Sequence, residues 1–273
     1  MAAVEVVTLN NGVQMPALGL GVWQVNAGDQ CRQAVLWALE AGYRHIDTAR
    51  IYRNEKDVGA AIRESGVPRP EIFVTTKLWN GDQGYDRALQ AFDTSLGALG
   101  LDYVDLYLIH WPVPETRDDS WRALQRILQE GRARAIGVSN YTERHLAELL
   151  GWADVRPAVN QVEFSPFLFQ SELLELCRGH GVQLEAYSPL TRGRRLQDGR
   201  ILEIAARMGR TPAQVLIRWA LQHETVVIPK SVCRERIFEN AAVFDFSLPA
   251  AEMAALDALD ESHHFAWDPS DVE

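Results

Sequence analysis

Four polar residues occupy positions in this sequence where they could carry chemistry. Asp47, Lys77 and His110 each end a short apolar segment, and Tyr52 follows Asp47 by five residues. A charge that is isolated at a partly buried strand end is costly, so we expect Asp47 and Lys77 to pair. The lysine charge beside Tyr52 would lower the pKa of the phenol from its usual value of about 10 and make it a proton donor.

His110 completes this candidate set if its ring is neutral. A neutral imidazole could donate a ring N–H to a carbonyl oxygen and orient the substrate. Taken singly, each of the four residues is better explained as a structural ion pair or a packed side chain. Taken together, they favour a site that protonates a carbonyl oxygen.

The elements that would position these residues are short β-rich segments that alternate with segments of helical period. This alternation predicts repeated βα units and a parallel sheet, after an opening hairpin at Asn11-Gly12. Most strand candidates are continuously apolar, as strands covered on both faces must be. Eight strands are predicted, and they end near Gly21, Asp47, Lys77, His110, Asn140, Glu163, Tyr187 and Lys230.

Helices are predicted between these strands by apolar spacing and by capping residues. One helical face should carry Leu89, Phe92, Leu96 and Leu99, and a second should carry Trp121, Leu124 and Leu128. Asn54 and Asp57 are spaced like a capping pair, and Thr211-Pro212 is typical of a helix start.

Eight βα units could form a closed barrel or a doubly wound open sheet. A dinucleotide fingerprint that starts at Gly19-Leu20-Gly21 would need a third glycine at position 24, where the sequence has Gln24. We therefore expect a (β/α)8 barrel with an N-terminal hairpin and extra helices, and a catalytic face at the carboxyl ends of its strands.

Composition narrows the class of protein further. A length of 273 residues suits one barrel, and no Pro/Gly/Ser-rich linker interrupts the chain, so residues 1–273 are expected to form a single domain. The net charge of −10 disfavours nucleic acid and anionic membranes as partners. The apolar runs are far shorter than the roughly 20 residues of a membrane span. The start, MAAVEVVTLNNG, does not resemble a signal peptide, so we expect the cytoplasm.

The three cysteines are far apart and lack CxxC spacing. Cys31, Cys177 and Cys233 are therefore expected to be small buried residues rather than metal ligands or a redox pair. The histidines are scattered, so no metal site is predicted.

The ordered motifs resemble those of the aldo-keto reductase superfamily, in particular its short-tailed bacterial members. The resemblance begins with the segment 47–55 (DTARIYRNE), TKLW at 76–79 and IHWP at 109–112. It continues through GVSN at 137–140, NQVE at 160–163, AYSPL at 186–190 and IPKS at 228–231, and so covers nearly the whole chain. It implies an NADPH-dependent reductase of aldehydes or ketones, with Asp47, Tyr52, Lys77 and His110 as the catalytic tetrad.

The same resemblance implies contacts along an extended NADPH. Ser139, Asn140 and Gln161 would bind the carboxamide, Tyr187 would stack on the nicotinamide, and Lys230, Ser231 and Arg236 would bind the 2′-phosphate. Independently, a lysine at a strand end and an arginine in the next helix could surround a phosphate, although a solvated basic patch is the alternative. The remaining cofactor contacts would be Gly21, Trp23, Ser188, Leu190, Val232, Glu239 and Asn240.

Three tryptophans follow strand ends and suit the wall of a pocket for a small carbonyl compound: Trp23, Trp79 and Trp111. A short tail, with His264 and Trp267 as weaker candidates for substrate contact, predicts an open pocket. Arg192, Arg194 and Arg195 could reach the pyrophosphate or belong to a solvated loop. Thr191 and Ser165 depart from the glycine and histidine of many relatives.

Two alternatives remain open at this point. The barrel could be a cofactor-binding regulatory module with little turnover, or a metal-dependent hydrolase or isomerase. The tetrad argues against the first, and the scattered histidines argue against the second. The resemblance also implies a monomer, whereas the physiological substrate is not determined by the sequence.

Overall fold

The protein forms a closed parallel barrel in the computed structural model, which describes residues 5–272. Residues 1–4 and 273 lie outside the described residues. The predictions of a single domain over 1–273 and of a start unlike a signal peptide include some of them. The barrel strands are β3 (Leu20–Gly21), β4 (His45–Asp47), β5 (Phe73–Leu78), β6 (Val104–Ile109), β7 (Ala133–Ser139), β8 (Val159–Glu163), β9 (Gln183–Tyr187) and β10 (Val226–Val227).

Each barrel strand pairs in parallel with the next, in the order β10-β9-β8-β7-β6-β5-β4-β3. The ring closes between its ends, where Leu18 forms a parallel bridge to Val227 and the Gly21 N–H donates to the Pro229 carbonyl at 3.2 Å. Glycine suits this closure, because a Cβ at Gly21 would lie only 3.0 Å from the Ile228 carbonyl oxygen. The predicted (β/α)8 barrel is therefore confirmed.

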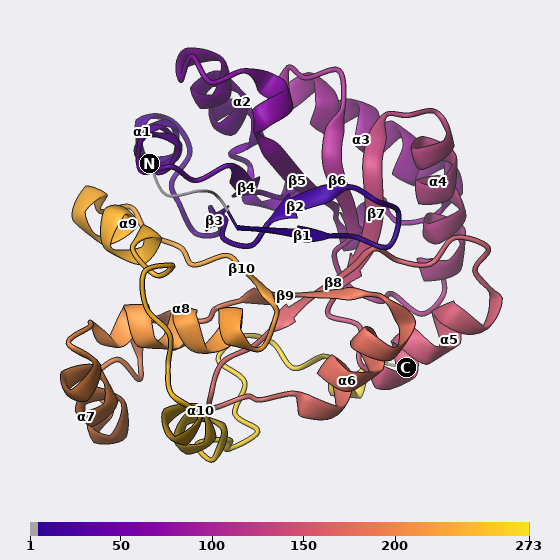
Figure 1. Ribbon diagram of the computed structural model, residues 1–273. Coiled ribbons are helices and arrows are strands. Elements are labelled where there is room, and N and C mark those ends of the chain that lie inside the picture. Colours follow the sequence, from indigo (N-terminus) through magenta and orange to yellow (C-terminus); the bar gives the residue numbers. More distant parts are fainter. Residues whose placement is uncertain (1–4, 273) are drawn as a thin grey trace.

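The predicted hairpin is also confirmed, and it caps the amino end of the barrel. It consists of β1 (Val6–Thr8) and β2 (Gln14–Pro16), which pair antiparallel and lie across the strand ring in Figure 1. The Asn10 side chain donates to the carbonyl of Pro157, two residues before β8. Met15 is fully buried and packs with Phe73, Leu106 and other residues inside the barrel. The hairpin thus closes the end opposite the candidate site.

Ten helices in residues 5–272 surround the strands, as Figure 1 shows. Those that follow successive strands are α1 (Asp29–Glu40), α2 (Glu55–Glu64), α3 (Tyr85–Leu99), α4 (Arg117–Gln129), α5 (Glu143–Trp152), α6 (Ser171–His180), α8 (Pro212–Gln222) and α9 (Arg234–Ala241). The extra helices are α7 (Gly199–Met208) and α10 (Ala250–Asp257). Phe92, Trp121 and Leu124 are fully buried against the barrel, as their spacing predicted, whereas Leu89 and Leu128 are only partly buried.

One helix start differs from its prediction. Asn54 does precede α2, but its side chain makes no cap and instead donates to the Val22 carbonyl at 3.0 Å. The Asp57 carboxylate accepts the N–H of Gly28 at 2.8 Å. The capping-pair interpretation was wrong because both side chains bind the loop after β3. By contrast, Pro212 lies in the first turn of α8, as predicted, and Thr211 caps this helix in a capping box.

Candidate active site

The structure brings the four candidate catalytic residues together at the carboxyl end of the barrel. The Lys77 ammonium lies 2.7 Å from both carboxylate oxygens of Asp47 and 2.9 Å from the Thr48 carbonyl. The Tyr52 hydroxyl lies 3.5 Å from the same nitrogen, at the end of the short helix η1 (Arg50–Tyr52). Lys77 and Asp47 are both buried, so their charges compensate each other in a place with little solvent screening.

The protonation state of Tyr52 differs in direction from the sequence-based expectation. Its pKa lies well above the usual value of 10, because burial and the carboxylates of Asp47 and Glu185 oppose the ionised form. The sequence led us to expect the ammonium of Lys77 to lower this pKa below the usual value. That expectation was wrong. At neutral pH the residue is therefore a protonated phenol, which is the form that can donate a proton.

His110 is a neutral imidazole beside this phenol. Burial and the charge of Lys77 hold its pKa well below the usual range. Its ring centroid lies 5.7 Å from that of Tyr52 and 5.4 Å from that of Trp79. Its Nδ1 atom is buried and has no hydrogen-bond partner among the described residues. A neutral ring in this position can orient a polar substrate group without adding charge.

A single large cavity of about 1160 Å³ connects these residues with the predicted cofactor positions. Asp47, Tyr52 and His110 line it, whereas Lys77 is fully buried and reaches it only through Tyr52 and Asp47. All predicted cofactor residues also line the cavity: Gly21, Trp23, Ser139, Asn140, Gln161, Tyr187, Ser188, Leu190, Lys230, Ser231, Val232, Arg236, Glu239 and Asn240. The volume exceeds that of an ordinary small-ligand pocket and suits a long ligand.

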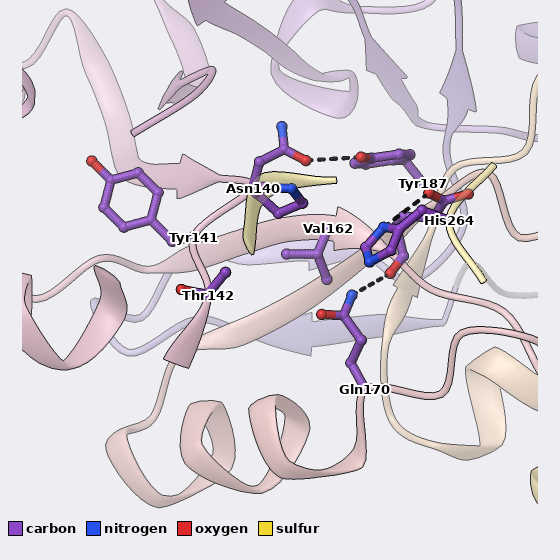
Figure 2. A pocket seen from close by; sticks show the side chains of 9 residues that line it. Asn140, Tyr141, Thr142, Val162, Gln170, Tyr187 and His264 are labelled. Carbon is purple, nitrogen blue, oxygen red and sulfur yellow. Dashed lines mark hydrogen bonds and ion pairs between the residues drawn. The ribbon is translucent and has the colours of Figure 1, made fainter. Parts of the chain in front are cut away.

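Strained backbone and a hydrogen-bond chain organise the end of the cavity near Tyr52. Asn140 and Ser188, directly after β7 and β9, have φ values of +62° and +50°, and such left-handed residues are typical of functional loops. The Tyr187 hydroxyl donates to the Asn140 side-chain oxygen at 2.8 Å, a contact visible in Figure 2. The Ser139 hydroxyl donates to the Gln161 carbonyl at 2.8 Å. These contacts fix three polar side chains at the cavity wall.

The cavity wall after β10 is cationic. Lys230 and Arg236 are exposed there, and neither forms an ion pair with any residue in 5–272. The neighbouring Arg234 differs, because it pairs with Glu40 at 2.5 Å. In a protein of net charge −10, two cations without a carboxylate partner favour an anionic ligand.

Glu239, expected near the adenine, already has a structural partner. Its carboxylate accepts a hydrogen bond from the Thr211 hydroxyl at 2.7 Å, which ties α9 to the start of α8. Asn240 lies beside it and is buried. Both residues line the cavity, so the structural contact of Glu239 does not remove it from this wall.

The three predicted wall tryptophans line the cavity and are joined by the tail. Trp267 also lines it, and its ring centroid lies 4.5 Å from that of Trp111. Arg192 bridges the mouth: its guanidinium lies 4.6 Å from the Trp23 ring centroid and donates to the Phe265 carbonyl at 2.9 Å. The tail therefore covers part of the pocket that the sequence predicted to be open.

Of the three loop arginines, only Arg192 lines the cavity. Arg195 pairs with Glu261 at 2.6 Å, and Arg194 does not line this cavity. Thr191, at a position where many relatives have glycine, adopts a φ of +53° and accepts the Arg195 N–H at 3.1 Å through its hydroxyl. Ser165 is buried, with no hydrogen-bond partner for its hydroxyl among residues 5–272.

Glu163 holds the tail in place, although the sequence marked it only as a strand end. Its two carboxylate oxygens accept the N–H groups of Phe265 and Ala266, each at 3.0 Å. His264 Nδ1 lies 3.7 Å from the same carboxylate, and Figure 2 shows His264 and Gln170 close together beside Val162. His264 therefore lines a neighbouring small pocket rather than the large cavity.

Glu185 is a second residue whose importance the sequence did not reveal. It is fully buried in β9 and accepts a hydrogen bond from the Gln161 side-chain nitrogen at 2.9 Å. The signal was present, because an ionisable glutamate stands between Leu184 and Ala186 in a predicted strand. Only the contacts across the barrel show what it faces.

Further predictions concerned cysteines, metal ions and membranes. Cys31 and Cys177 are buried, but Cys233 is partly exposed and lines the cavity, which corrects the expectation for that residue. Within residues 5–272 no group of three histidine, cysteine or acidic side chains is arranged to hold a metal ion. No helix in the described part of the chain has the length and apolarity needed to span a bilayer.

Comparison with known proteins agrees with this geometry. The profile of the aldo/keto reductase family matches residues 17–261. Glyoxal reductase of Bacillus subtilis is 50% identical over 268 residues, which cover 98% of this chain and 97% of that protein. Morphine 6-dehydrogenase of Pseudomonas putida is 51% identical, over 98% of this chain and 95% of that protein.

Solved structures show the same likeness. A Bombyx mori aldo-keto reductase in complex with NADP has a TM-score of 0.91 and 37% identity, over 97% of this chain and 96% of that one. The aldo/keto reductase of Brucella melitensis has a TM-score of 0.91 and 47% identity, over 94% of this chain and all of that one. The chain therefore belongs to the aldo/keto reductase family of oxidoreductases.

Proposed function

We propose that the protein reduces aldehydes or ketones to alcohols with NADPH, with Tyr52 as the proton donor. The observation that carries the proposal is that one cavity is lined both by a protonated phenol and by two cations that have no ion-pair partner in residues 5–272. When bound, NADPH supplies the hydride that reaches the carbonyl carbon. The protein's own groups supply the proton, the orientation of the substrate and the charge balance.

Tyr52 gives its hydroxyl proton to the substrate oxygen as that oxygen becomes basic. The tyrosinate that results lies 3.5 Å from the Lys77 ammonium, which stabilises it. Asp47 keeps the lysine charged and fixes its position with two contacts at 2.7 Å. His110, held neutral, orients the substrate oxygen.

The cavity residues suit NADPH along its length. Ser139, Asn140 and Gln161 would hold the carboxamide and Tyr187 would stack on the ring, while Lys230, Ser231 and Arg236 would bind the 2′-phosphate. The two cations without an ion-pair partner in residues 5–272 support this assignment, because a phosphate would provide the missing anion. The other contacts proposed are Gly21, Trp23, Ser188, Leu190, Val232, Glu239 and Asn240.

The substrate would be a small carbonyl compound enclosed by aromatic rings. Trp23, Trp79 and Trp111 would form its wall, and Trp267, in ring contact with Trp111, extends that wall from the tail. Glyoxal reductase and morphine 6-dehydrogenase, both about half identical to this chain, bear names that span small dicarbonyls and a large alkaloid. We therefore propose activity on several carbonyl compounds.

A substrate panel tests this function directly. The purified protein would be mixed with NADPH and with glyoxal, a keto-sugar acid or an aromatic aldehyde, and the loss of NADPH absorbance followed. We expect oxidation with several of these compounds, unchanged by a chelator. Tight NADPH binding without oxidation by any carbonyl would instead support the regulatory module.

The proposal includes a single-domain monomer that acts in the cytoplasm. One continuous hydrophobic cluster that contains residues from β3 to the tail supports the single domain. Light scattering in solution tests the monomer, with a mass near twice that of one chain as the contrary outcome.

A further inference from the structure

Beneath the proposed catalytic residues lies a buried polar layer in which Glu185 and His45 have no role in the mechanism above. The Gln161 side-chain nitrogen donates to Asp47 at 2.8 Å and to Glu185 at 2.9 Å. Glu185 and His45 are both fully buried, and His45 Nε2 lies 3.6 Å from Glu185 Oε1. Since β4 and β9 are not neighbours in the sheet, this contact crosses the interior of the barrel. The layer thus connects two carboxyl groups through one amide.

The two carboxyl groups have very different surroundings. Asp47 receives the Lys77 ammonium on both oxygens and Gln161 on one of them. Glu185 receives only Gln161, and its Oε1 atom has no hydrogen-bond partner in the described part of the chain. A buried ionised carboxylate with one hydrogen bond and no adjacent cation is expensive, whereas a neutral carboxylic acid is tolerated there.

Counting charge in the layer leads to the same assignment. The groups that face Glu185 are His45 and Asp47 from β4, Lys77 from β5, Gln161 from β8, and Tyr52 from η1. His45 is neutral, because burial and Lys77 lower its pKa to about 3. One ammonium therefore serves two carboxyl groups, and Asp47 holds it. Burial and the Asp47 charge accordingly raise the pKa of Glu185 to about 8.

We propose that Glu185 is a positioning residue that must stay protonated for Tyr52 to donate its proton, so that activity falls at alkaline pH as Glu185 ionises. The reason is electrostatic. An ionised Glu185 would compete with the nascent tyrosinate for the field of the one ammonium, Lys77, and its charge raises the pKa of Tyr52. Glu185 does not line the cavity, so it acts on the reaction only through Tyr52, Asp47 and Gln161. This inference rests on the proposed reductase function.

The pH dependence of kcat with Glu185→Gln tests the proposal. In the wild-type protein, kcat for carbonyl reduction should fall about tenfold between pH 7 and pH 9, since Tyr52 itself titrates well above pH 10. The amide resembles the protonated acid in shape and cannot ionise. The variant should therefore keep kcat at pH 7 within about threefold and lose most of the fall above pH 8.

A matched control separates this effect from burial alone. Glu55 is also buried and has a raised pKa because of its burial, but it accepts its hydrogen bond from Thr76 and has none to Gln161 or Asp47. Glu55→Gln should therefore keep the alkaline fall in kcat. The same fall in Glu185→Gln as in the wild-type protein would overturn the proposal and assign the limb to another group.

Infrared difference spectra between pH 7 and pH 9 give a readout that does not depend on turnover. The wild-type protein should lose the carbonyl stretch of a protonated carboxylic acid as pH rises, and Glu185→Gln should lack this change. The same band change in the variant would overturn the assignment. If no carbonyl compound is reduced, the proposed function fails, yet the infrared result still decides whether Glu185 carries the proton.

A second variant guards against misfolding. If Glu185→Gln does not give folded protein by circular dichroism, Glu185→Thr offers a neutral, β-branched side chain that suits a strand. It should also lack the alkaline fall in kcat between pH 7 and pH 9. A fall equal to that of the wild-type protein would contradict the proposal in this variant as well.

Discussion

Asp105 and Asp47 are buried carboxylates at opposite ends of the same barrel, and they differ in the number of cations around them. Asp105, near the amino end of β6, receives Arg69 at 2.7 Å, Arg134 at 2.8 Å and the Val74 N–H at 2.9 Å. At the carboxyl end, the single ammonium of Lys77 is shared by a layer with two carboxyl groups. Asp105 at the amino end therefore has two cations to itself. The carboxyl end has a cavity and, in our proposal, a protonated Glu185.

An acidic residue within a buried strand can therefore serve either the stability of the fold or the chemistry of the site. Asp47 and Asp105 are both acidic residues within buried strands. Asp105 is held by two arginines and a backbone N–H and does not line the cavity, so we expect it to stabilise the fold. The loops at the carboxyl end leave a cavity, so that the charges there can act on a ligand.

The largest effect should come from Tyr52→Phe, which should impair the chemistry at the carboxyl end and leave the amino end unchanged. The change removes the donated proton and should lower kcat by roughly 100- to 10,000-fold. NADPH affinity, measured by fluorescence titration, should hardly change. Near-normal turnover in this variant would show that Tyr52 is not the proton donor.

Asp105→Asn should break the amino end without changing the chemistry. Two arginines would lose the carboxylate between them, and the free energy of unfolding should fall by about 3 kcal/mol. Chemical denaturation measures this loss, with the exposed pair of Asp119 and Arg122 as a control. Asp119→Asn should cost less than about 1 kcal/mol, because that pair is solvated. A kcat that collapsed in folded Asp105→Asn would contradict the separation of the two ends.

Arg236→Leu tests whether an arginine without a carboxylate partner among the described residues serves a ligand. Arg69 and Arg134 have a carboxylate partner, whereas Arg236 has none among the described residues, so its loss should affect a ligand rather than the fold. We expect NADPH binding to weaken by roughly 1.5 to 3 kcal/mol and NADH binding to change little. Arg234→Leu, which removes the partner of Glu40 in the same helix, is the control and should leave both affinities nearly unchanged. Equal losses for both cofactors with Arg236→Leu would refute the phosphate assignment.

The smallest effect concerns the tail, which is held by another buried carboxylate, Glu163. Its cation partner, His264, can lose its charge. The nearby carboxylates of Glu163 and Asp268 raise the pKa of His264, although partial burial opposes the shift. A raised pKa in the folded state means that the ion pair stabilises tail docking fully below the unfolded value near 6.5. This contribution is lost as pH rises through the raised value.

The expected change is modest because the pair is partly solvated. The contribution should be below about 1 kcal/mol, so KM for an aromatic aldehyde should rise by less than about fivefold over that pH range. His264→Gln should remove this pH dependence of KM, and His263→Gln, at the exposed neighbouring position, should keep it. An unchanged pH dependence in His264→Gln would dissociate this ion pair from the substrate pocket.

The sequence by itself determined the barrel and the identity of its active end. Alternating elements predict parallel strands, and the carboxyl ends of parallel strands meet at one edge, so Asp47, Lys77 and His110 had to converge. Motif order then located the residues that line the cavity. Strand boundaries were less certain: β10 ends at Val227, three residues before the predicted Lys230, because the chain pairs only briefly there.

Only the tertiary structure decided the electrostatics of the site. Asp47 and Gln161, whose side chains meet at 2.8 Å, are 114 residues apart in sequence, and Glu185 joins them from a strand across the barrel. Burial and these neighbours set the direction of the Tyr52 pKa, which the sequence predicted wrongly. The docking of the tail on Glu163 likewise joins residues that are 102 apart in sequence. The energy of two charges depends on the distance between them and on their exposure to solvent. The spacing of residues along the sequence gives neither quantity.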